Sequence, residues 1–199
     1  MSTIRKSPMS TLKLTQLSIL IALIAVLTFT PLGFIMIPPI SMTILHIPVI
    51  IGAILLGPTY GGILGFSFGI MSMIRAIWSG NPGDMLFSPF ASGNPLGSIV
   101  MCILPRILLG VIVGYLFLLI KKADQKGYIA ITVSAIIGTL LHTIMVLGCL
   151  WAFFKAFPLQ QVFLAIVSLN ALLEIASAAI FSVAICKPLF KLNNKTAKQ

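Results

Sequence analysis

The residues of this sequence that are best suited to chemistry are four polar side chains set in long apolar runs. Arg106 is the most unusual, because an arginine inside an apolar helix is costly unless it is paired or faces a polar cavity. Glu174 follows Asn170 by four residues, which places both on one helical face. His142 falls at a similar depth in another run, so we hypothesise that the four converge on one cavity. The pattern predicts either a ligand site around Arg106 or a buried Arg106–Glu174 ion pair that fixes helix packing.

Three further interpretations concern single polar residues. For His142, a hydrogen bond to a neighbouring helix and a contact with a ligand both remain open. His46 lies near the outer end of an apolar run, just before Pro48, and this position favours a structural role. Asn94, in a loop rich in glycine, serine and proline, is counted with the substrate-binding candidates.

The sequence lacks the motifs of the common hydrolytic and ATP-driven enzymes. It contains no G-x-x-x-x-G-K-[ST] phosphate loop, no H-E-x-x-H pair, no nucleophile elbow and no neighbouring carboxylates for acid/base hydrolysis. Cys102, Cys149 and Cys186 are isolated within apolar runs, which argues against a disulfide framework or a zinc site. We therefore expect no enzymatic activity, no metal and no cofactor.

Composition places the chain in a membrane. Of its 199 residues, 59% are hydrophobic and 8% are charged, whereas roughly a quarter of residues are charged in soluble domains. A net charge of +10 could suggest nucleic acid as a partner. The chain, however, offers no surface large enough for a duplex, so we exclude nucleic acid and assign the basic tails to anionic lipid heads of the bilayer.

Apolar segments of sufficient length predict the architecture, since a spanning helix needs about 20 apolar residues. Six segments qualify, at about 12–30, 40–56, 60–78, 97–120, 128–153 and 161–186. The second is the least regular, because it is short and contains Pro48. We predict an all-α integral membrane protein, a single bundle of six transmembrane helices that forms one membrane domain over 1–199, with a basic cytoplasmic tail at 187–199.

The basic residues predict the orientation of this bundle. Ten of the thirteen lysines and arginines form three clusters, at Arg5, Lys6 and Lys13, at Lys121, Lys122 and Lys126, and at Lys187, Lys191, Lys195 and Lys198. Positively charged loops stay on the cytoplasmic side, so both termini are expected inside. Segments 31–39, 79–96 and 154–160 then face outward, as lids over an outward-facing pocket or as ordinary solvated loops. Arg75 and Lys155 fall at the outer rim.

Small residues predict where helices pack closely. Gly57, Gly61, Gly65 and Gly69 recur every four residues and form one smooth stripe, which lets helix backbones approach in lipid. In the first segment, Ser18, Ala22 and Ala25 provide a second face of small residues that could serve a partner protein.

Several stretches together resemble a known family. They are Ile44–Pro58 with its His46-Ile47-Pro48, Leu104-Pro105-Arg106, Gly138–Thr143 with His142, and Asn170 with Glu174. From about residue 12 to 187 the chain resembles the substrate-binding S components of energy-coupling factor (ECF) vitamin transporters, closest to the pantothenate-type branch. The resemblance implies a multi-pass protein of the prokaryotic plasma membrane that captures a vitamin from outside. It also implies three partner subunits, namely a transmembrane coupling protein and two ATPases.

The resemblance also implies roles for particular residues. Family members dock on the coupling protein through an alanine-x-x-x-alanine face of the first helix, which corresponds here to Ser18 and Ala22. Pantothenate carries one carboxylate, which Arg106 could grip through two parallel hydrogen bonds, while Asn170 and His142 could satisfy its hydroxyl and amide groups. We hypothesise that Glu174 orients Arg106 and leaves one edge free.

Alternatives remain open at this point. A closed Arg106–Glu174 pair would make the site nearly neutral, which favours a flavin or a pyrimidine alcohol as the ligand. A stand-alone proton-coupled secondary carrier is a further alternative, and Glu174 would be its proton carrier.

Overall fold

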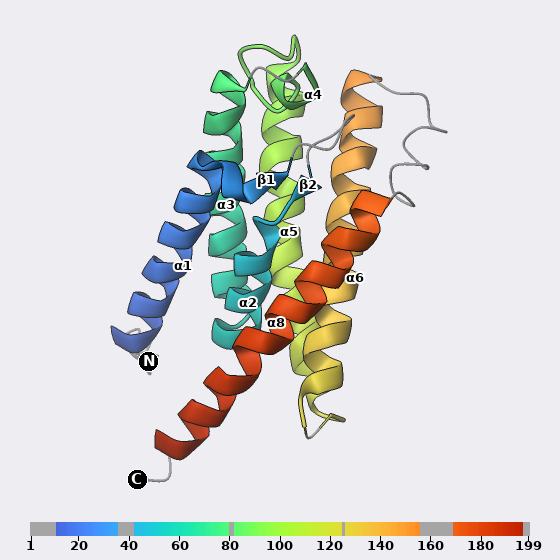
Figure 1. Cartoon of the computed structure of the whole chain (residues 1–199). Coiled ribbons are helices and arrows are strands. Elements are labelled where there is room, and N and C mark those ends of the chain that lie inside the picture. The colour runs from blue at the N-terminus through green and yellow to red at the C-terminus, as the bar shows by residue number, and fades with distance from the viewer. Residues whose placement is uncertain (1–10, 36–41, 80–81, 125, 156–168, 197–199) are drawn as a thin grey trace, which may run out of the picture.

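The protein is a bundle of helices that run up and down between two ends (Figure 1). The computed structural model describes residues 11–35, 42–79, 82–124, 126–155 and 169–196. The long helices are α1 (Thr11–Phe29), α3 (Pro58–Trp78), α5 (Pro95–Lys121), α6 (Tyr128–Cys149) and α8 (Leu169–Thr196). The short elements are α2 (His46–Leu56), α4 (Pro82–Met85), a 3-10 turn at Pro31–Gly33, and a π-helical turn at Leu150–Phe154 that prolongs α6.

Five of the helices are long and apolar enough to cross a membrane, which confirms five of the six predicted spans. Of the predicted span 161–186, residues 161–168 lie outside the described part of the chain. The all-α class is also confirmed, with one small addition. Strands β1 (Phe34–Ile35) and β2 (Met42–Thr43) form a two-stranded antiparallel hairpin in which Phe34 faces Thr43. The hairpin lies among the helices rather than above them (Figure 1).

The second predicted span, 40–56, is wrong in length. Helix α2 begins only at His46 and has 11 residues, so it extends about 16 Å, roughly half of a bilayer core. Ten of these residues are buried, because α1, α3, α5, α6 and α8 all pack against α2. Met42 and Thr43, which the prediction placed in this helix, form strand β2 instead. As α2 returns directly into α3 at Gly57, its first residue lies about halfway up the bundle.

The described members of the three basic clusters gather at one end of the bundle, as predicted. Helix α1 begins and α8 ends on that side in Figure 1. Lys13 Nζ lies 5.9 Å from the ring centroid of Tyr60, and Lys187 Nζ lies 3.7 Å from that of Tyr128. The predicted sixth helix ended at residue 186, but α8 continues through the basic segment to Thr196.

Helices α3 and α5 make the closest contact of the bundle through glycines, as the stripe predicted. A Cβ atom at Gly61 would collide with the backbone of Gly110, and one at Gly69 would lie 2.6 Å from the carbonyl oxygen of Cys102. A Cβ at Gly65 would collide with the carbonyl group of Arg106. Gly57 is not part of this seam, because it forms the turn before α3 with a φ of 103°. The seam therefore sets the height and rotation of Arg106 relative to α3.

Gly65→Ala should lower the thermal stability of the purified protein. Its Cβ would meet backbone atoms of Arg106 and Ile107, which cannot move aside without shifting α5, and overpacking of this kind costs about 1–3 kcal/mol. Gly62→Ala is the matched control, since its Cβ would meet only side-chain methyl groups, at 3.1 Å from Val111 Cγ2 and 3.9 Å from Ile107 Cγ2. Thermal unfolding in detergent gives the melting temperature of each variant. Equal melting temperatures would contradict the conclusion that glycines let α3 and α5 pack closely at Gly65.

Candidate functional site

Arg106 is buried in the middle of α5, and the residue before it explains how its guanidinium is held. Pro105 has no N–H group, so it cannot donate to the carbonyl of Met101 one turn earlier. Arg106 Nη1 donates to that carbonyl oxygen at 2.6 Å instead. The Pro105-Arg106 sequence thus both frees an acceptor inside the helix and supplies the donor that uses it.

Two phenyl rings cover the same guanidinium. Its central carbon lies 5.1 Å from the ring centroid of Phe68, on α3, and 5.4 Å from that of Phe87, in the loop after α4. Arg106 is 4% exposed, and its Nε has no hydrogen-bond partner in the described part of the chain. An aromatic face attracts a cation but does not neutralise it. The arrangement therefore leaves a buried positive charge with donors to spare.

The expected pair of Arg106 with Glu174 does not form. Within the described residues, the ion pair that the structure contains joins Arg75 to Asp84. The Glu174 carboxylate instead accepts a hydrogen bond from the backbone N–H of Thr43, at 2.9 Å from Oε1. Glu174 thus ties α8 to strand β2, and the hypothesis that it orients Arg106 is wrong for this structure.

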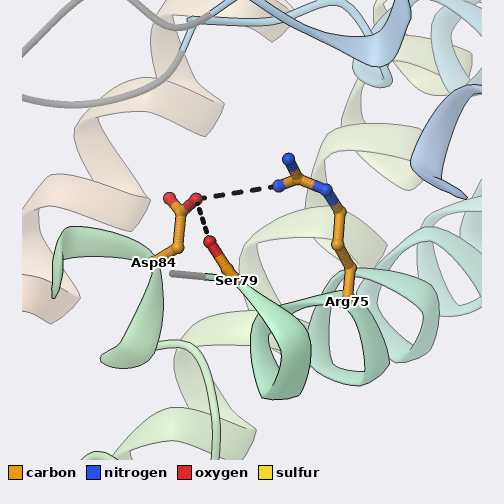
Figure 2. Close-up of polar contacts among 3 residues, drawn as sticks. All are labelled: Arg75, Ser79 and Asp84. Atoms are coloured by element: carbon orange, nitrogen blue, oxygen red, sulfur yellow. Dashed lines mark hydrogen bonds and ion pairs between the residues drawn. The ribbon is translucent and has the colours of Figure 1, made fainter. Parts of the chain in front are cut away.

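The Arg75–Asp84 pair holds the outer loop that carries Phe87. Arg75 Nη1 lies 3.7 Å from Asp84 Oδ2, and Ser79 Oγ donates to the same oxygen at 2.8 Å (Figure 2). Further along the loop, Cys102 Sγ donates to the carbonyl oxygen of Phe87 at 3.2 Å. The described part of the segment between α3 and α5 is therefore tied to both helices, and the outer-rim charge of Arg75 is engaged with Asp84.

A chain of rings connects Arg106 to two histidines. The His142 ring, on α6, lies 6.2 Å from that of Phe68, and it stacks on His46, at the start of α2, with 6.2 Å between centroids. His46 is 1% exposed and His142 is 7% exposed. The sequence placed Arg106 and His142 at one depth, and the structure brings them together through Phe68. His46 was missed, because the predicted longer helix put it near the membrane surface.

Of the two asparagines predicted to bind substrate, Asn170 and Asn94, the structure describes the side chain of Asn94. Asn170 is in the first turn of α8, but its side chain lies outside the described residues. Asn94 caps α5, since its side chain accepts from Gly97 N at 3.0 Å and donates to the carbonyl oxygen of Phe153 at 3.4 Å. It lies about 18 Å along the helix from Arg106, so the structure does not bring Asn94 to the other candidates.

Helix α1 presents the small residues of its predicted docking face outward. Ser18 and Ala22 are exposed, whereas Ala25 is half-buried. The Ser18 hydroxyl donates to the carbonyl oxygen of Leu14 within the helix, at 3.0 Å. Three residues of α1 are buried, so most of its surface is free of contacts with the described rest of the bundle.

Together, these features define a multi-pass membrane protein with a buried cationic site at mid-depth. Residues 12–187 match the family model described as the substrate-specific component of ECF transporters. The chain belongs to this family, and it is a transporter component that resides in the prokaryotic cell membrane and works with an ECF module.

Individual relatives agree with this assignment. The chain is 33% identical over 167 residues to the pantothenic acid transporter PanT of Lactococcus lactis subsp. cremoris, covering 79% of this chain and 82% of the relative. It is 28% identical over 177 residues to the pantothenate transporter PanT of Leuconostoc mesenteroides, covering 82% and 81%. The crystal structure of an S component for biotin from an ECF-type ABC transporter matches with a TM-score of 0.59 over 90% of each chain. Its identity of 22% makes this a likeness of fold.

Glu174→Ala should release the hairpin, whereas Glu174→Gln should not. Glutamine keeps an acceptor oxygen for the Thr43 N–H, while alanine leaves that donor without a partner. Amide hydrogen exchange, followed by mass spectrometry on the peptide that contains Thr43, should accelerate about tenfold for alanine, which corresponds to the loss of one hydrogen bond. Faster exchange in both variants would mean that the charge, rather than the hydrogen bond, holds the hairpin.

Proposed function

We propose that this S component captures pantothenate from outside the cell for ATP-driven uptake. The observation that carries the proposal is the Arg106 guanidinium, which is buried near the rings of Phe68 and Phe87 without a carboxylate partner among the described residues. A buried charge without a partner costs several kcal/mol, so the site favours a ligand that brings a negative charge. The names of the two PanT relatives support pantothenate as this ligand.

The chemistry of pantothenate fits the residues around Arg106. Its carboxylate can take two parallel hydrogen bonds from a guanidinium, and Arg106 Nε is still without a partner in the described structure. Its amide and hydroxyl groups require polar partners farther along the molecule, where His142 contributes an imidazole. Its geminal methyl groups require apolar contact, which the surrounding rings provide.

The separation of Glu174 from Arg106 weakens the case for a neutral ligand. A flavin or a pyrimidine alcohol would suit a closed ion pair, but the Glu174 carboxylate is bonded to Thr43 N. Other anionic vitamins remain as alternatives that competition can rank. A stand-alone carrier would need no partner subunits, and membership of the ECF family speaks against it.

The partners that we propose are a transmembrane coupling protein and two ATPase subunits. The exposed face at Ser18 and Ala22 supports docking on the coupling protein, since small side chains permit close helix contact in lipid. Ala25 would lie at the edge of this contact, because it is half-buried against the bundle.

Arg106→Ala should reduce pantothenate binding by about 100-fold or more, because it removes the charged partner of the carboxylate. Panthenol, which carries an alcohol in place of the carboxylate, should bind the native protein weakly and the variant about equally weakly. Calorimetry on the purified protein measures all four affinities. Retention of normal pantothenate affinity by Arg106→Ala would refute the assignment.

Lys155→Asn is the matched control for this experiment. Like Arg106→Ala, it removes one positive charge, here at the outer rim. Asparagine also tolerates the left-handed backbone of this position, where φ is 46°. Its pantothenate affinity should stay within about threefold of the native value. A loss as large as that of Arg106→Ala would point to general attraction of the anion instead of a specific site.

Ala22→Trp should abolish uptake without changing pantothenate affinity. The bulky ring would hold the coupling protein away from α1, while Arg106 remains undisturbed. Uptake of labelled vitamin in cells and co-purification of the coupling protein test this, with Ile180→Trp as control, because Ile180 is 66% exposed on α8. Equal uptake by the two variants would show that the coupling protein docks on another surface.

A further inference from the structure

The stacked histidines offer a second polar site next to the cationic one. The Nε2 atoms of His46 and His142 are buried and lack hydrogen-bond partners in the described part of the protein. Leaving a buried donor or acceptor unsatisfied costs about 1–3 kcal/mol each, and native structures keep such groups rare. Two of them on adjacent rings, from α2 and α6, therefore require an explanation.

We propose that His46 is a ligand-binding residue, and that His46 and His142 together recognise the hydroxyl-bearing end of the ligand. This inference rests on the proposed function, because it takes the carboxylate to lie at Arg106. It assigns a specificity role to a residue whose sequence context favoured a structural one.

The His46 ring lies against backbone but keeps one nitrogen without a partner. The backbones of Thr43 and Glu174 are next to the ring, and a histidine that only stabilised the turn before α2 would need these neighbours alone. Its Nε2 atom is buried and has no hydrogen-bond partner among the described atoms. The Nε2 edge is the part of the side chain that the described fold does not use.

Arg106 and the two histidines would recognise different parts of the ligand. Phe68 is close to both the guanidinium, 5.1 Å from its ring centroid, and the His142 ring, 6.2 Å away, and His142 in turn stacks on His46. A ligand that reaches both groups therefore extends over these three contacts, with its anionic group at one end and its other polar groups toward the second end. A neutral imidazole can donate or accept through Nε2, according to its tautomer. This suits hydroxyl groups, which both donate and accept.

The pair His46→Gln and His46→Asn tests the inference. The glutamine amide can reach the position of Nε2, whereas the asparagine amide reaches only that of Nδ1. Each variant is titrated calorimetrically with pantothenate and with its dideoxy analogue, in which hydrogen replaces both hydroxyls. The native protein should prefer pantothenate by about 30-fold, a ratio that corresponds to one or two buried hydrogen bonds. His46→Gln should keep most of this preference, and His46→Asn should lose at least tenfold of it with little change in affinity for the analogue.

Ser134→Ala is the control, because Ser134 is a fully buried hydroxyl on α6, without a described partner and farther toward the inner end than His142. Its preference for pantothenate should match that of the native protein. If His46→Asn keeps the preference and His46→Gln loses it, His46 acts through Nδ1 as a structural residue, and the inference is overturned. Equal losses for both ligands overturn it as well. Failure of the native protein to bind pantothenate would instead refute the proposed function itself.

Discussion

The contact on which the rest of the site depends is the glycine seam between α3 and α5. Because Gly61, Gly65 and Gly69 carry no side chains, the two backbones approach until the carbonyl of Arg106 lies against Gly65. Phe68, one residue before the last of these glycines, then covers the Arg106 guanidinium. In lipid, where apolar contact alone gives little drive for helix association, such close packing is what fixes one helix against another. The position of the cation is thus a consequence of backbone packing.

This cation is held without being neutralised. Pro105 removes the N–H that would occupy the Met101 carbonyl, and Arg106 takes that carbonyl as an acceptor. The phenyl rings of Phe68 and Phe87 add attraction without adding charge. An acidic partner would stabilise the empty protein more, but it would compete with an anionic ligand for the same donors. Lower stability without ligand is the expected cost of a site that must capture an anion.

The sequence predicts the parts of this arrangement that follow from length and charge. Apolar segments long enough to span, three basic clusters and the depth of Arg106 and His142 can be read from composition and rise per residue. The depth of His46 cannot be predicted in this way, because no sequence pattern indicates that the residues before α2 form a strand inside the bundle. The hydrogen-bond partner of Glu174 cannot be predicted from the sequence either. Residue spacing places Glu174 on the same helix face as Asn170, but it does not show that this face turns toward Thr43.

Burial of the site has a consequence for how a ligand reaches it. Arg106 is 4% exposed, so a carboxylate can contact it only after a covering element moves. One cover is the loop with Phe87, which is tied to α3 through Arg75–Asp84 and to α5 through Cys102. The other element to consider is the hairpin, which Glu174 ties to α8 through its hydrogen bond with the Thr43 N–H. Because that hairpin leads directly into His46, its movement would alter the second polar site as well, which links access to recognition at the same end of α2.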